Sequence, residues 1–560
     1  MLVSKVDIKT TSSAIWWIKY PQQPQQQQQQ QQAEHTQSRA ISLCQDMTDL
    51  FSNISLHGYS ELFDSELLLY EKLIWLCLHI TTFVVMIIIL SFTWDYFVAQ
   101  YFAINLHDPL YSVDKIAFPA ISICSNNRIS YEAAENYALE LSQKDIYNNS
   151  LEYYMERIAY FNSLYHKYGR VNNIEEFSNF QTFLDNYGTW DNDTFYNVLR
   201  TMHLLTPKCE ELLVKCSLDG KEIECFHKNH FQTGLTGYGP CCIFNAENVY
   251  RQRSHQRFGR SDAGLTVVLN SSQVNDVVSL LNMDAYVVII HKASNFPDVA
   301  SGEVIEMFPI HNEETFVAIK ARVMNTSENL RIFPSTYRKC LFNDETPKKD
   351  LLLHHSYSFA NCITRCRIQS IKALCKCVPF YTPLEYLASK DGVVYCTLKH
   401  VVCMDRYNFK WRNVLTQTVT NVQGLESEAE EALYCPQCLP SCNDIQYQVS
   451  MMSLPTNRFW VQENLHNERN LDINDMSVLH VYFGKPTALY YKRVLRNTWV
   501  EAFSTVGNIL SIVMGVSLVA VFELSYFLVK YLVIAFKLFI KQNRKQNIDK
   551  EFKEKLYICP

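Results

Sequence analysis

Small and polar side chains recur at helical spacing near the C-terminal end of the chain. From Ala502 to Phe522 the sequence carries no charged residue, which is long enough for a helix to cross a hydrocarbon core. One stripe of that helix would hold the residues at i, i+4, i+7 and i+11, namely Ser504, Asn508, Ser511 and Gly515. Glu523 follows, and a carboxylate at membrane depth costs about 2.5–3.5 kcal/mol and usually faces a cavity or a partner. The pattern favours a helix that borders water and cations.

Close helix packing is a second interpretation of the same small residues. Gly507, Ser511 and Gly515 fit the small-xxx-small pattern by which two membrane helices approach each other. Packing accounts for the glycines and serines, but it does not account for the acid at Glu523. The interpretation as an ion pathway is therefore preferred.

Cysteines are concentrated in one part of the chain. Of the 19 cysteines, all but Cys44, Cys77 and Cys559 lie between Cys124 and Cys442. Such a dense set predicts a disulfide framework in an oxidising compartment. Cys435 and Cys438 also have the spacing of a redox or zinc motif, but plain disulfides explain them better here, and no metal site is expected. The same region carries the glycosylation sequons at Asn148, Asn192, Asn270 and Asn325.

Two apolar spans frame this cysteine-rich region. The first runs from Leu73 to Trp94 and would act as an uncleaved signal anchor, because the run Ala14–Ile18 is too short for a signal peptide. Basic residues exceed acidic ones after the second span, which places the C-terminus in the cytosol. The expected segments are a cytoplasmic N-terminal segment with a glutamine run (1–72), a first membrane helix (73–96), an extracellular domain (97–497), a second membrane helix (498–536) and a basic cytoplasmic tail (537–560).

Composition and local patterns narrow the class of protein further. A formal net charge of −6 over 560 residues gives no reason to expect a nucleic-acid partner. No motif of a hydrolase, metalloprotease, phosphate-binding or dinucleotide-binding enzyme occurs, so no catalytic residue is expected. Cys362 and Cys366 are spaced to lie one turn apart on a helix. We expect a helical lobe over 130–205, strands over 264–270, 285–290 and 303–323, and a last strand at Val481–Phe483 that runs into the second span.

Several short motifs, taken in their order along the chain, resemble those of the degenerin and epithelial sodium channels. Within that family they are most similar to the insect pickpocket branch, and they cover nearly all of the chain from His57 to Phe527. The motifs are His57-Gly58, Phe118-Pro119-Ala120-Ile121-Ser122-Ile123-Cys124, Gly239-Pro240-Cys241-Cys242-Ile243-Phe244-Asn245, Gly264-Leu265-Thr266, Tyr357-Ser358 with the cysteine run from Cys362 to Pro379, Cys438-Leu439-Pro440-Ser441-Cys442, and Gly515-Val516-Ser517 with Glu523.

The resemblance implies a membrane protein of α+β fold. Two transmembrane helices would flank a large disulfide-rich extracellular domain of palm, finger, thumb and knuckle, and three subunits would form the channel. The activity would be that of a sodium-selective, amiloride-sensitive, voltage-independent channel of the plasma membrane, gated by an extracellular chemical or mechanical stimulus. No cofactor is implied beyond the permeant Na⁺. Partners would be related subunits in a homotrimer or heterotrimer, membrane lipid, and an extracellular ligand or a mechanical tether.

The resemblance also assigns roles to individual residues. The selectivity filter would be formed by Gly515, Val516 and Ser517, whose carbonyls and hydroxyl replace part of the hydration shell of a cation. The pore would be lined by Ser504, Asn508, Ser511 and Glu523. Gating would involve His57, Gly58 and Ser504. Asn508 and Ser511 stand where the family usually has glycine, and they place polar groups toward the pore axis.

The disulfide pattern of the family, carried over, would pair every extracellular cysteine. It would join Cys124 to Cys241, Cys209 to Cys216, Cys340 to Cys442, Cys362 to Cys438, Cys366 to Cys435, Cys375 to Cys403 and Cys377 to Cys396. Cys225 and Cys242 remain, and they would form one further bridge, as in pickpocket-like members.

Two other functions compete with a conducting subunit. A non-conducting or accessory receptor subunit would use the same extracellular domain and function only with partner channel subunits. An ATP-gated channel shares two spans and a cysteine-rich loop, but it would need a lysine-rich phosphate site and would leave the Gly-x-Ser sequence unexplained. The polar stripe and Glu523 favour the conducting subunit.

Overall fold

The structure is a computed structural model of the chain. It describes residues 58–63, 66–99, 101–165, 174–187, 196–227, 230–246, 264–271, 276–279, 283–345, 357–383, 393–416, 431–456, 475–496 and 498–555. The glutamine run, His57 and Asn192 lie outside the described residues. Two compact units make up the chain: residues 1–101 together with 496–560, and residues 102–495.

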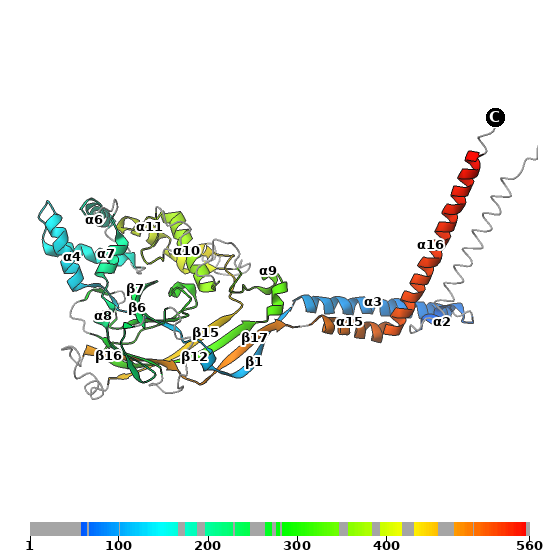
Figure 1. The fold of residues 1–560 in the computed structure, drawn as a ribbon, viewed down its shortest axis with the longest axis horizontal. Helices are drawn as coiled ribbons and strands as arrows, with labels where there is room; N and C mark the ends of the chain where they lie inside the picture. Colours follow the sequence, from blue (N-terminus) through cyan, green and yellow to red (C-terminus); the bar gives the residue numbers. More distant parts are fainter. Residues whose placement is uncertain are drawn as a thin grey trace, which may run out of the picture. The chain divides into compact units, whose positions relative to one another are not determined.

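The first unit is helical in its described part. The short helix α2 (Tyr59–Phe63) precedes the long helix α3 (Leu69–Ala99), which extends beyond the expected 73–96 at both ends. Near the C-terminus, α15 (Trp499–Met514) lies beside α3, and α16 (Leu518–Lys555) turns away from both (Figure 1).

Two stretches of this unit bear on membrane insertion. Among the described helices, α3 alone is long and apolar enough by itself to cross a membrane, with an apolar stretch over Leu69–Phe97 whose mean hydropathy reaches 2.7. The second candidate is α15 together with the first part of α16, bent by 82° at the break between them. The expected membrane helix over 498–536 is therefore interrupted, and α16 continues to Lys555, well into the expected tail.

An eight-stranded sheet is the largest element of the second unit. Its central strand β12 (Glu313–Thr326) pairs in parallel with β16 (Met476–Phe483) and β17 (Thr487–Leu495), and antiparallel with β15 (Asp444–Pro455). Along the sheet the order is β1 (Phe102–Ser112), β17, β12, β16, β8 (Leu265–Asn270), β4 (Leu213–Leu218) and β5 (Lys221–Ile223).

The last strand before α15 differs from the expected one. Val481–Phe483 ends the buried strand β16, and the turn Gly484-Lys485-Pro486 leads into β17. The prediction that Val481–Phe483 runs into the second span is therefore wrong. Strand β17 carries Lys492 and Arg493 and is only half-buried, which makes its apolar pattern weaker than that of β16.

A five-stranded sheet packs against the large one. Its order is β11 (Ile305–Met307), β10 (Val287–His291), β2 (Ala120–Cys124), β7 (Gly239–Phe244) and β6 (Phe231–Thr236). Alternate side chains of both sheets share one core, among them Ile121, Phe244, Leu265 and Val481. Within the large sheet, Gly264 directly before β8 permits close approach to β16, because a Cβ there would overlap the backbone oxygen of Val481.

Helices and short strands complete the second unit. The expected helical lobe is present as α4 (Tyr131–Lys144), α5 (Leu151–Ile158), α6 (Ile174–Tyr187) and α7 (Val198–Leu205), which share one apolar core. Helix α10 (Phe359–Cys375) carries Cys362 and Cys366 one turn apart, as predicted. The other short elements are α8 (Cys209–Leu212), α9 (Ser335–Arg338), α11 (Val401–Arg406), α12 (Asn408–Arg412), the 3₁₀ turns η1 (Val113–Lys115), η2 (Ala159–Leu164), η6 (Val299–Ser301), η7 (Glu328–Ile332) and η10 (Leu398–His400), and the strand pairs β3 (Asn127–Ser130) with β9 (Asp276–Ser279) and β13 (Val414–Leu415) with β14 (Leu433–Tyr434).

Disulfides staple this unit, and most of them are the pairs that the resemblance implies. These are Cys124–Cys241, Cys340–Cys442, Cys362–Cys438, Cys366–Cys435, Cys375–Cys403 and Cys377–Cys396. The expected pairs Cys209–Cys216 and Cys225–Cys242 are wrong, because the structure joins Cys209 to Cys242 and Cys216 to Cys225.

Strand geometry explains this exchange of partners. Cys241 and Cys242 are neighbours in β7, so their side chains leave opposite faces of the sheet. Cys241 therefore meets Cys124 on one face, and Cys242 meets Cys209 at the start of α8 on the other. Across the β4–β5 hairpin, Cys216 lies opposite Ile223, which brings Cys225 within its reach.

Candidate functional site

Helix α15 begins at a reciprocal cap formed by Thr498 and Glu501. The Glu501 backbone N–H donates to the Thr498 hydroxyl at 3.3 Å, and the Thr498 backbone N–H donates to the Glu501 carboxylate at 2.7 Å. These bonds satisfy two N–H groups that would otherwise be unpaired, and they fix the first residue of the helix. Sequence reasoning missed this pair, although Thr-x-x-Glu is a readable signal for a helix start.

The polar stripe of α15 lies on a face that the chain itself does not cover. Ser504, Asn508 and Ser511 are exposed, whereas the half-buried positions are Ala502, Thr505, Ile509, Leu510, Val513 and Met514. A Cβ added at Gly507 would meet no atom within 4 Å. Within one subunit, Gly507 therefore does not mediate close helix packing, and the stripe is available to solvent or to another subunit.

The predicted filter residues form the break between α15 and α16. Gly515 ends α15 in the left-handed region at φ 67°, where glycine is favoured, and its N–H donates to the Ser511 carbonyl at 2.9 Å. The N–H of Val516 reaches back to the Leu510 carbonyl at 3.3 Å. The Ser517 hydroxyl then accepts the N–H of Ala520 at 3.1 Å and caps the start of α16. The three residues make one compact turn between two helices.

The break separates Glu523 from the polar stripe. Glu523 is half-buried and lies on α16, whose axis is bent by 82° from that of α15. The membrane helix expected over 498–536 is therefore not one continuous helix from Ser504 to Glu523. Glycine at the left-handed position and serine at the cap together end one helix and start the next, which apolar periodicity alone does not reveal.

Gly58, the described half of the predicted gating motif, contacts helix α3. Its backbone has φ 70°, and a Cβ there would lie 2.8 Å from the Trp75 ring. The Nε2 of His79 lies 3.0 Å from the Gly58 carbonyl oxygen, so this nitrogen donates the hydrogen. The rings of Trp75 and His79 stack with their centroids 6.2 Å apart. Sequence reasoning missed the roles of Trp75 and His79, and only their spacing of four residues within the apolar helix hints at a shared face.

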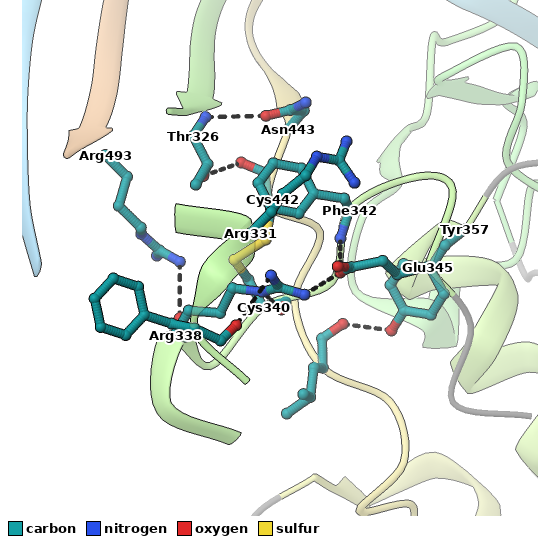
Figure 2. Close-up of a disulfide and its surroundings, with 12 residues drawn as sticks. Thr326, Arg331, Arg338, Cys340, Phe342, Glu345, Tyr357, Cys442, Asn443 and Arg493 are labelled. Carbon is teal, nitrogen blue, oxygen red and sulfur yellow. Dashed lines mark hydrogen bonds and ion pairs between the residues drawn. A yellow bond between two sulfur atoms is a disulfide. The ribbon is translucent and has the colours of Figure 1, made fainter. Parts of the chain in front are cut away.

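In the second unit, the Cys340–Cys442 bridge is joined by hydrogen bonds to strands β12 and β17 (Figure 2). The Thr326 backbone N–H donates to the Asn443 side-chain oxygen at 2.9 Å, and the Thr326 hydroxyl donates to the Cys442 carbonyl at 2.6 Å. On β17, the guanidinium of Arg493 donates to the Arg338 carbonyl at 3.3 Å.

Charged and aromatic side chains complete this cluster. The Arg338 guanidinium donates to the Cys340 carbonyl at 3.0 Å and forms an ion pair with Glu345. Two guanidinium groups contact the Phe342 ring, with the guanidinium carbon of Arg331 4.0 Å and that of Arg338 4.9 Å from the ring centroid. Because β17 ends at Leu495 and α15 begins at Trp499, the cluster is linked to α15 by a very short length of chain.

A cavity of about 410 Å³ lies next to the same bridge. Polar groups line it, among them Asn295, Asn343, Ser358, Asn443 and the ion pair between Lys292 and Asp444. Burial lowers the pKa of Lys292, while Glu303 at 3.4 Å opposes that shift. Among the described residues, no cluster of His, Cys, Asp and Glu has the arrangement of a metal site.

Comparison with known proteins links the whole arrangement to one family. The profile of the amiloride-sensitive sodium channel family matches residues 50–527. The chain is 21% identical over 490 residues to sodium channel protein Nach of Drosophila ananassae, which covers 87% of each chain. It is 24% identical over 376 residues to pickpocket protein 28 of Drosophila melanogaster, covering 57% of this chain and 56% of the relative. It is 23% identical over 358 residues to epithelial sodium channel subunit beta of Xenopus laevis, covering 60% and 50%.

Proposed function

The chain belongs to the amiloride-sensitive sodium channel family, and on that premise we propose that it is a subunit of a sodium-selective cation channel. The family is one of membrane ion channels rather than enzymes, and several of the relatives are sodium channel proteins by name. In this proposal the channel is amiloride-sensitive and voltage-independent, and an extracellular chemical or mechanical stimulus opens it.

The observation that carries the proposal is the break between α15 and α16. A turn of Gly515, Val516 and Ser517 offers backbone carbonyls and a hydroxyl, which are the ligands that Na⁺ prefers. The exposed stripe of Ser504, Asn508 and Ser511 leads to this turn along one helix. Three copies of such a stripe around an axis would line a polar path, and Glu523 beyond the turn would raise the local concentration of cations.

The proposed topology has two spans, with both termini in the cytosol of the plasma membrane. Helix α3 would be the first span, and the bent pair of α15 and α16 would supply the second. The eight disulfides of the described residues support an extracellular position for residues 102–495. Of the proposed glycosylation sites, Asn148 is exposed, whereas Asn270 and Asn325 are half-buried and donate hydrogen bonds.

Assembly into a homotrimer or heterotrimer is part of the proposal. Strand β1 is an edge of the large sheet, and its Ile104, Leu106 and Leu110 are 51%, 49% and 72% exposed. An exposed apolar edge strand calls for a covering partner. A second copy or a related subunit would cover it. The similarity to a chain named subunit beta favours the heteromeric form.

The cavity beside Cys442 supports a chemical stimulus. A ligand that enters it would touch Asn443 and Asp444, next to the bridge that is tied to β17. Strand β17 leads directly to α15, so an occupied cavity would act on the pore helix along the chain. A mechanical tether on the same domain would use the same route.

An accessory role is the second candidate, and two residues favour it. Asn508 and Ser511 replace glycines of the family pattern and are larger than the residues they replace. Three copies of these larger side chains would narrow the pore. A subunit that carries them would therefore conduct only in a heterotrimer whose other subunits have smaller side chains at these positions. The two candidates differ in whether the chain alone carries current.

The test is to express the chain alone in oocytes and to record currents from wild type, Ser504→Val and Ser517→Ala in the Ser504→Val background. A bulky side chain at the exposed stripe is expected to hold the pore open, so Ser504→Val should give a constitutive, sodium-preferring current. Ser517→Ala removes the cap of α16, which costs about 1 kcal/mol, and should shift the reversal potential when potassium replaces sodium.

Thr505→Val is the matched control for Ser504→Val. Thr505 is half-buried and its hydroxyl donates to the Glu501 carbonyl, so it lies off the exposed stripe. It should leave the channel closed. An equal current from Thr505→Val would contradict the assignment of the stripe. Silence of surface-expressed Ser504→Val, both alone and with a pickpocket-type partner, would contradict the channel proposal, whereas current only with the partner would establish the accessory role.

A further inference from the structure

Arg128 on β3 is a fully buried guanidinium without a carboxylate. Its exposed fraction is 1%, and among the described residues no acid forms an ion pair with it. One nitrogen, Nη1, lies 3.7 Å from the sulfur of Cys241. The other two, Nε and Nη2, are buried and have no hydrogen-bond partner among the residues that the structure describes. The described part of the chain therefore leaves this buried positive charge uncompensated.

Two aromatic rings flank this guanidinium but do not neutralise it. The rings of Tyr165 and Tyr238 each have their centroid 5.7 Å from the Arg128 guanidinium carbon. Tyr165 comes from the end of the helical lobe, and Tyr238 comes from the turn between β6 and β7. Burial lowers the pKa of Arg128 to about 10, so the group stays charged at neutral pH. A desolvated cation–π contact contributes about 2 kcal/mol, but it offers no acceptor for the N–H groups.

The two unpartnered nitrogens define what is missing. Nε and Nη2 lie on the same edge of a guanidinium, so their N–H groups point in parallel and form a two-pronged donor. A buried charge of this kind normally has a paired anion, because leaving it unpaired costs several kcal/mol. A matched acceptor at this edge would satisfy both prongs at once.

We propose that the Nε–Nη2 edge of Arg128 binds a small monovalent anion, for which chloride is the natural candidate outside a cell. The surroundings select for size: two tyrosine rings and the Cys124–Cys241 bridge enclose the guanidinium, so a large organic anion has no access. The bound ion links β3 and the small sheet to the helical lobe through Tyr165. Its role is structural, and it is separate from the conduction of cations.

Halide titration of the full-length protein in detergent tests the proposal. At constant ionic strength, replacement of gluconate by chloride or bromide should raise the unfolding temperature of the wild type by about 1–3 °C and then saturate. Arg128→Gln should abolish the rise. Arg128→Lys keeps the charge but loses the two-pronged edge, so it should weaken halide binding about tenfold or more.

Arg157→Gln is the matched control. Arg157 also stacks on a tyrosine, with its guanidinium carbon 3.3 Å from the Tyr153 ring centroid, but it is only part-buried and has its own acceptor. It should retain the full response to halide. If Arg128→Gln does not fold, crystals of the wild type in bromide decide: an anomalous peak at the Arg128 edge supports the site. A map without an anomalous peak would mean that the site holds only an ordered water, and it would overturn the proposal. An unfolding temperature that does not depend on halide would overturn the proposal as well.

Discussion

At the scale of single residues, Gly58 has the most constrained surroundings of the predicted gating residues that the structure describes. Its positive φ disfavours any other residue, and its missing side chain makes room for Trp75. The contact also carries the hydrogen bond from His79 to the Gly58 carbonyl. The Gly58 backbone, the Trp75 ring and the His79 imidazole therefore hold the chain before α3 against that helix.

Gly58→Ala should disrupt this contact. The left-handed backbone costs an alanine about 1–2 kcal/mol, and the new Cβ would collide with the Trp75 ring. The docked arrangement should lose about tenfold in population. The measurement is whole-cell current divided by the number of channels at the surface, recorded in the Ser504→Val background.

Trp75→Leu separates the clash from the backbone strain. The smaller side chain makes room for the alanine, so Gly58→Ala with Trp75→Leu should recover part of the loss relative to Trp75→Leu alone. Additive effects of the two substitutions would contradict a direct contact between the residues.

At the scale of elements, the exchanged disulfides give a test that needs no functional assay. Because Cys216 pairs with Cys225 across the β4–β5 hairpin, Cys216→Ser should free the thiol of Cys225 and leave Cys209 protected. Maleimide labelling of the denatured, unreduced protein followed by peptide mapping identifies the freed residue.

Cys242→Ser is the matched variant for that experiment. It should free Cys209 and leave Cys225 bonded, because β7 sends the side chains of Cys241 and Cys242 to opposite faces. Labelled Cys209 in the Cys216→Ser protein would restore the pairs that the family pattern implied and contradict the structure.

The elements also show what a sequence can and cannot specify. The spacing of Cys362 and Cys366 and the β-branched, apolar run of β8 are local signals, so those elements follow from the sequence. Strand β17 was missed because it is half-buried and carries charges, so neither burial nor alternation marks it clearly. The break at Gly515 was missed because apolar side chains continue across it, and the family resemblance rather than periodicity pointed to that tripeptide.

At the scale of the whole molecule, acid should loosen the second unit through His291. This residue is buried, its Nδ1 donates to the Lys292 carbonyl at 2.8 Å, and its Nε2 accepts from the Ser122 hydroxyl at 3.0 Å. Burial lowers the pKa of His291 to about 4 in the folded chain, against an ordinary 6.5. Between pH 6.5 and pH 4, His291 therefore binds a proton in the unfolded chain but stays neutral in the folded chain.

The sign of the pH dependence follows from that difference. Stability is complete above pH 6.5 and falls as the pH drops toward 4, by about 2 kcal/mol at pH 5 from this residue alone. The unfolding temperature of the full-length protein should therefore fall between pH 7.5 and pH 5, and His291→Gln should reduce the fall. His107→Gln, at an exposed position, should not reduce it. An undiminished fall in His291→Gln would exclude His291 as the cause.

The order of the bridges in the cysteine-rich region has a consequence for how the chain matures. Cys377–Cys396 lies inside Cys375–Cys403, which lies inside Cys366–Cys435, then Cys362–Cys438, then Cys340–Cys442, and no bridge crosses another. The innermost pair is 19 residues apart and the outermost is 102 residues apart. Once an inner bridge has formed, the next pair closes a far shorter ring, so each closure reduces the entropy cost of the next. Each ring therefore closes at the lowest entropy cost when oxidation proceeds from the innermost bridge outward.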